Sequence, residues 1–121
     1  MTKEISLGDE RYRIRSLSRE SGWVAFAERS DTGDRFGIDC VAPSEAEAVD
    51  RLIEWLDWQH EHAAALEALQ QAERVYHRAM AGSAFANPTE DPTPVELQRE
   101  SLDAVEAARL RLDDVRSRKP L

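Results

Sequence analysis

The longest stretch without proline or glycine, residues 44–81, limits the possible folds more than any other feature of this sequence. It is rich in Ala, Leu, Glu, Gln and Arg, which favour helices, so we predict one continuous helix. Ser44 and Glu47 stand at the spacing of a capping box at its start, and Gly82 follows its end, where glycine commonly terminates a helix. At a rise of about 1.5 Å per residue this helix would be about 57 Å long.

Apolar side chains of this helix fall on two faces when its residues are projected at about 100° per residue. The first face lies in the N-terminal half, and we expect it to cover a sheet. It holds Val49, Leu52, Ile53 and Leu56. The second face has the seven-residue spacing of a helix-to-helix seam, and large aromatic side chains on it predict a surface for a partner. The candidate interaction residues are Trp55, Trp58, His62, Leu66, Leu69 and Tyr76.

Residues 1–43 are predicted to form a three-stranded antiparallel meander, because apolar and polar residues alternate in short runs. The three expected strands are residues 11–17, 23–29 and 36–41. Residues 1–10 have too little pattern for a prediction, although Ile5 and Leu7 leave a short edge strand open. A meander of this size needs a helix on one face, and we expect the first half of the long helix to provide it.

The prolines in residues 83–94 predict a loop after the long helix, and Phe85 is the residue of this loop that we expect to dock on another surface. Thr93, Pro94 and Glu96 then mark the start of a second helix, since they combine a capping box with proline at the first helical position. Its predicted apolar seam is Ser101, Leu102, Val105, Ala108, Leu112 and Val115. We expect this helix to fold back antiparallel on the C-terminal half of the long helix.

The predicted fold class is therefore α+β, with three strands followed by two helices (βββαα). The chain length is sufficient for one domain with a modest core. We predict a single domain, residues 1–121, made of a β-meander (1–43), the long helix (44–81), a loop (82–93) and a C-terminal antiparallel helix (94–117).

The charge balance restricts the classes of partner. With 24 acidic and 16 basic residues the net charge is −8, which argues against a general nucleic-acid binder because phosphate contacts need a basic surface. No run approaches the roughly 18 apolar residues of a membrane helix, and the polar N-terminus is unlike a signal peptide. The single cysteine, Cys40, cannot form an internal disulfide, and we expect it to be buried. We therefore expect a cytoplasmic protein that binds neither nucleic acid nor membrane.

The histidines and nearby acids of the long helix are the candidate metal ligands. His60 and His62 are two residues apart, so on a helix they point about 200° away from each other and cannot hold one ion. Asp57 with His60, and Glu73 with His77, have workable helical spacings, but two ligands do not make a metal site. We therefore expect no metal ion and no cofactor.

Three arginines, Arg11, Arg13 and Arg15, alternate along the first expected strand and so share one of its faces. They have two interpretations. A basic strand of this kind could bind phosphates while lying in a nucleic-acid groove. Alternatively, they guard an exposed sheet face against aggregation and pair with acids across the sheet, such as Glu28. We favour the second interpretation.

The region from Tyr12 to about Trp58 resembles the strand–strand–strand–helix unit of HicB-type antitoxins. The residues that carry the resemblance are Tyr12-Arg13-Ile14, Gly22-Trp23-Val24-Ala25 and Ser44-Glu45-Ala46-Glu47-Ala48. In that family the unit is a partly degraded RNA-binding fold that neutralises a small ribonuclease toxin. The chain departs from the family where Glu28 to Gly33 replaces a proline- and glycine-containing segment, and where a long helical hairpin replaces the DNA-binding tail.

We predict a non-enzymatic protein–protein interaction or scaffold protein that forms a homodimer through its long helix. The reason is that the tryptophan face exceeds what a small sheet and a shorter second helix would cover, and most soluble oligomers are symmetric homodimers. Two alternatives stay open. One is an antitoxin-like or regulatory module whose acidic helix binds a basic protein partner. The other is a small metal-dependent enzyme that uses Asp57, His60, Glu73 and His77.

Overall fold

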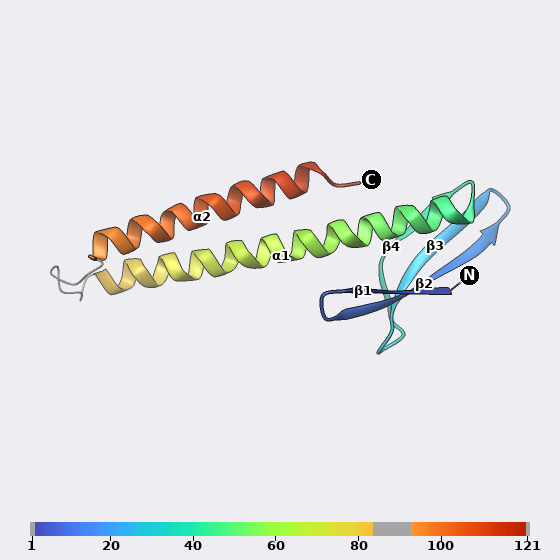
Figure 1. Cartoon of the computed structure of the whole chain (residues 1–121), viewed down its shortest axis with the longest axis horizontal. Helices are drawn as coiled ribbons and strands as arrows, with labels where there is room; N and C mark the ends of the chain where they lie inside the picture. The colour runs from blue at the N-terminus through green and yellow to red at the C-terminus, as the bar shows by residue number, and fades with distance from the viewer. Residues whose placement is uncertain (1, 84–92, 121) are drawn as a thin grey trace. The chain divides into compact units, whose positions relative to one another are not determined.

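The computed structural model of the chain describes residues 2–83 and 93–120. It has an α+β fold, as predicted, with a four-stranded antiparallel sheet followed by two helices (Figure 1). The elements are β1 Thr2–Leu7, β2 Glu10–Arg19, β3 Gly22–Arg29, β4 Arg35–Ala42, α1 Glu45–Ser83 and α2 Pro94–Ser117. Most of the predicted loop 82–93, including Phe85, lies outside the described residues.

The prediction of a three-stranded meander is wrong, because β1 adds a fourth strand at the edge of the sheet. Leu7 pairs with Glu10, so Gly8 and Asp9 alone connect β1 to β2. Gly8 has a φ of 61°, and a two-residue loop with glycine first and a positive φ is typical of a type II′ hairpin turn. The sheet order is β1-β2-β3-β4, with each strand antiparallel to the next.

The chain divides into two compact units, which are described separately. Unit 1 comprises Met1–His60 with Lys119–Leu121, and unit 2 comprises Glu61–Arg118. Helix α1 contributes to both, with residues 45–60 in unit 1 and residues 61–83 in unit 2.

The core of unit 1 lies between the sheet and the first half of α1. The strands contribute mostly small buried side chains, and the helix contributes larger ones. Together they are Ile14, Ala25, Ala27, Cys40, Ala42, Ala48, Val49, Leu52, Trp55 and Leu56. Alanines on β3 and β4 let the helix approach closely, so that Leu52 and Leu56 are almost completely buried. The predicted sheet-covering face of the helix is confirmed: three of its members are buried, and Ile53 is partly buried against the same core.

Unit 2 is a helical hairpin. Arg118, at the C-terminal end of α2, forms an ion pair with Glu61 on α1, whereas Leu97, near the start of α2, shares a groove with Val75 and Ala79. The two helices are therefore antiparallel. The buried residues of this unit are Ala65 on α1 and Ser101, Val105, Leu112 and Val115 on α2. Leu102, which was expected in the seam, is 39% exposed and lies outside it.

Candidate interaction surface

Trp55 lies in the core of unit 1, where other parts of the chain cover it. The exposed fraction of its side chain is 8%, and its ring centroid is 6.5 Å from that of Phe36 on β4. It occupies the space beside Gly37, where an added Cβ would stand only 2.4 Å from Cζ3 of the tryptophan. This side chain was expected to face helices or a partner; because the sheet covers it, we remove it from the candidate interaction residues.

Trp58 and His62 also have contacts within the chain. In unit 1, Nζ of Lys119 lies 5.6 Å from the ring centroid of the half-buried Trp58, within the range of a cation–π interaction. In unit 2, Nε of Arg116 donates a hydrogen bond of 3.3 Å to Nε2 of His62. Each of these side chains therefore makes a contact within its own unit.

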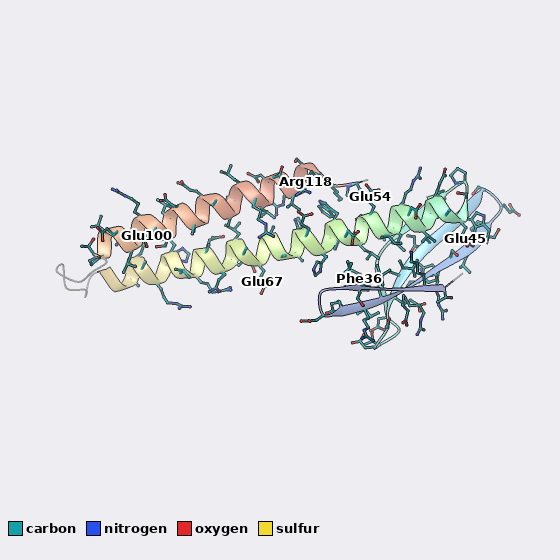
Figure 2. All side chains as sticks on the ribbon, viewed as in Figure 1. Phe36, Glu45, Glu54, Glu67, Glu100 and Arg118 are labelled. Carbon is teal, nitrogen blue, oxygen red and sulfur yellow. The ribbon has the colours of Figure 1, made fainter. Side chains whose placement is uncertain are left out.

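A charged contact joins the C-terminal end of α2 to Glu61, where the unit 2 part of α1 begins. Nη2 of Arg118 lies 2.8 Å from Oε1 of Glu61 and 3.3 Å from Oδ2 of Asp114. The hydrogen bond from Arg118 lowers the pKa of the Glu61 carboxyl below its ordinary value. Figure 2 shows Arg118 at this end of α2 and Glu100 towards the other end. This exposed contact links the C-terminal end of α2 to α1.

The other three candidates, Leu66, Leu69 and Tyr76, lie on the α1 part of unit 2 and are half-buried. Ala65 beside them is fully buried. The Tyr76 ring also lies 6.0 Å from the ring of His77, measured between centroids. Each of these apolar side chains is therefore partly exposed.

Sequence reasoning missed the exposed apolar residues of the hairpin. Among the described residues, eight large hydrophobic side chains are exposed, and six of them belong to unit 2: Val75, Met80, Val95, Leu97, Leu102 and Leu110. The most exposed are Leu110 at 71% and Val95 at 66%. The spacing of Val95 and Leu102, seven residues apart, was a detectable sign of a second apolar stripe on this helix.

An open groove runs along one side of the hairpin. Its volume is about 280 Å³, and its lining residues are Val75, Ala79, Leu97, Glu100, Ser101 and Ala104. The lining is mostly apolar, with Glu100 as its charged group. The groove offers no set of convergent polar groups of the kind that orient a small ligand.

Two of the three arginines predicted to share a face of β2 pair with acids on neighbouring strands. Nε of Arg15 lies 3.5 Å from Oε2 of Glu28, and Nη2 of Arg13 lies 3.8 Å from Oε1 of Glu4 on β1. The predicted pairing with Glu28 is therefore confirmed. Both arginines are partly exposed, so each pair contributes little to stability, but the pairs offset the positive charge of Arg13 and Arg15.

Within residues 2–83 and 93–120, no group of three or more His, Cys, Asp or Glu side chains is placed to hold a metal ion. Cys40 is 3% exposed, and burial raises the pKa of its thiol, which disfavours the nucleophilic thiolate. In the same described part of the chain, neither helix carries an apolar stretch sufficient to span a bilayer.

Comparison of the chain with protein families, with curated proteins and with solved structures found no match in any of the three. The similarity of its strands and first helix turn to HicB-type antitoxins stays a prediction.

Proposed function

We propose that this chain is a non-enzymatic protein–protein interaction or scaffold protein that forms a homodimer through its helices. The observation that carries the proposal is the concentration of exposed large hydrophobic side chains on the helical hairpin, with Leu110 and Val95 the most exposed. Large exposed apolar patches typically mark interaction sites, and six of the eight exposed large hydrophobic side chains among the described residues lie on this unit.

The architecture of unit 2 supports the same proposal. A hairpin of two helices has only one internal seam, and the residues buried in this unit are Ala65, Ser101, Val105, Leu112 and Val115. Helices obtain most of their stability from burying an apolar face. Two hairpins that associate would bury a second face on each, as four-helix assemblies do. A second copy of the chain is the simplest partner, because soluble homo-oligomers are mostly two-fold dimers.

The interface proposed here differs from the one expected from sequence. It no longer includes Trp55, which the sheet covers, and it centres on unit 2. Leu66, Leu69 and Tyr76, on α1, are half-buried within the hairpin and stay candidates, but the interface proposed here does not depend on them.

The test compares two double variants of the full chain. Replacing both Leu102 and Leu110 by serine is expected to shift the protein towards a monomer, measured by light scattering over a concentration series. The matched control replaces Leu17 and Val41, which are 44% and 55% exposed in unit 1, and is expected to leave the dimer intact. A dimer that survives the first change and dissociates on the second would contradict the proposal.

A further inference from the structure

Helix α2 has two apolar stripes. The first faces α1 and is buried: Ser101, Val105, Leu112 and Val115. The second lies on the outer side of the helix. At about 100° per residue, Val95, Leu102 and Leu110 fall within about 80° of one another around the helix and more than 50° from any member of the buried stripe. Their exposed fractions are 66%, 39% and 71%. Charged residues Arg99, Asp103, Glu106, Arg109 and Asp113 share this outer side and are exposed.

The outer stripe has a symmetry that the buried one lacks. Three pairs of outer-side residues at equal distances before and after Glu106 are chemically complementary. Four residues away on either side are Leu102 and Leu110. Three residues away are Asp103 and Arg109, and seven residues away are Arg99 and Asp113. Reversing the direction of the helix therefore exchanges acid for base and leucine for leucine.

We propose that two copies of the chain pair through α2, with the helices antiparallel and a two-fold axis passing beside Glu106. This inference rests on the proposed homodimer and specifies its interface. In this register Leu102 of each copy lies opposite Leu110 of the other. Asp103 lies opposite Arg109, and Arg99 opposite Asp113. Because a two-fold interface is isologous, each contact occurs twice.

Charge complementarity selects the antiparallel orientation. Counted outwards from Glu106 on the outer side, an acid and then a base precede it (Asp103 and Arg99), and a base and then an acid follow it (Arg109 and Asp113). In the antiparallel register each of these acids therefore lies opposite a base. A parallel pair would place Asp103 against Asp103 and Arg109 against Arg109, and like charges in contact are destabilising.

The four charged side chains of this register are available for a partner. In the described part of the chain, Arg99, Asp103, Arg109 and Asp113 form no ion pair; the pairs that involve α2 are those of Arg118. Glu106 is the one unfavourable position, since it meets its own copy at the axis. It also lies within one turn of Arg109 on both copies, which offsets the repulsion.

The test uses charge reversal and rescue in the full chain. Asp103→Arg and Arg109→Asp are made singly and together, and the dimer dissociation constant is measured by analytical ultracentrifugation. Each single change makes two contacts repulsive, so we expect the constant to rise roughly tenfold. The double variant restores both contacts with the charges exchanged, and its constant is expected to return to within about twofold of the starting value.

Matched controls separate this effect from a general effect of charge. Glu67→Arg and Arg78→Asp lie on exposed positions of α1 in the same unit. They are expected to leave the dissociation constant unchanged, singly and together. Circular dichroism establishes that each variant keeps its helix content.

Cross-linking gives an independent test of the register. Glu106→Cys places a thiol beside the proposed axis on each copy, so a short bis-maleimide is expected to produce covalent dimers in high yield. Glu67→Cys is the control and is expected to give little product. The native Cys40 is buried and is not expected to react.

The outcomes distinguish the two proposals. A chain that is monomeric at every concentration overturns both. A dimer that resists charge reversal and does not cross-link through position 106 overturns the α2 register and leaves the homodimer standing. If a charge-reversal variant unfolds, the cross-linking yield of the Glu106→Cys protein replaces it as the test. A high yield supports the α2 register, and a yield no greater than that of Glu67→Cys overturns it.

Discussion

Gly37 and Trp55 together explain why the tryptophan is buried in the sheet unit. Gly37 has a φ of 82° and lies where the register between β3 and β4 shifts, between Ala25 and Ala27. The shift and the absence of a side chain leave a space on β4 that the Trp55 ring fills. One residue without a Cβ thus determines which face of α1 can lie on the sheet.

Gly37→Ala is therefore expected to lower the free energy of unfolding by about 2–4 kcal/mol, from overpacking against Trp55 and from backbone strain at a positive φ. Gly33→Ala is the matched control: it has a φ of 75° with no atom within 4 Å of an added Cβ, so only strain of about 1 kcal/mol is expected. Urea unfolding measures both. Equal losses would show that the tryptophan does not fill the space beside Gly37.

Glu61 is a second residue whose environment makes a measurable prediction. The hydrogen bond from Arg118 lowers the pKa of its carboxyl. A carboxyl with a lowered folded pKa contributes stability that is present above its unfolded pKa of about 4.3 and is lost as the pH falls through the folded value. The contact between the helices of unit 2 is therefore expected to weaken in acid.

An NMR titration of the Glu61 carboxyl carbon tests this contact. In the unaltered chain its pKa is expected to lie below that of an ordinary glutamate. In Arg118→Gln it should rise towards the ordinary value, because both the hydrogen bond and the positive charge are removed. Asp114→Asn, which removes the other acid near Arg118, should leave it low. An unchanged pKa in Arg118→Gln would show that Arg118 is not the cause.

At the scale of elements, both helices and three of the four strands were predictable because their signals are local. Residues 44–81 and 94–117 were expected to be helical, and the helices found are Glu45–Ser83 and Pro94–Ser117. Strand β1 stayed an open possibility and was not counted in the predicted sheet, because it is an edge strand in which only Ile5 and Leu7 are partly buried. Its two-residue turn with Gly8 at the first position was the available signal.

The faces of the helices were harder to predict than the helices themselves. Val49, Leu52 and Leu56 were assigned to the sheet because they form a compact apolar arc. Trp55 was placed outside that arc, since its burial depends on Gly37, a long-range pairing that helical periodicity cannot show. Leu102 belongs to the predicted seam, but it lies about 100° around the helix from the buried Ser101 and is exposed.

The start of α2 has a local determinant that is testable by itself. The side chain of Thr93 accepts a hydrogen bond of 3.2 Å from the backbone nitrogen of Glu96, and Oε2 of Glu96 accepts one of 3.0 Å from the Thr93 nitrogen. Thr93→Ala is expected to destabilise the hairpin by about 1 kcal/mol. Hydrogen exchange should quicken in the first turn of α2. Ser117→Ala, at the other end of the helix, is the control and should leave that turn unchanged.

For the whole molecule, the two units differ in how completely they bury their apolar side chains. Unit 1 has a core shared by the sheet and α1, closed by large residues such as Leu52 and Trp55. Unit 2 has one helix–helix seam and carries most of the exposed large hydrophobic residues. Burial of apolar surface is the dominant favourable term in association, so the hairpin is the unit for which a second copy offers the larger gain.

The mass of the unaltered chain in solution tests this account most directly. Light scattering across a concentration series is expected to give a mass approaching twice the 13.7 kDa of one chain, falling towards that of one chain on dilution. A mass of one chain at every concentration would contradict the homodimer.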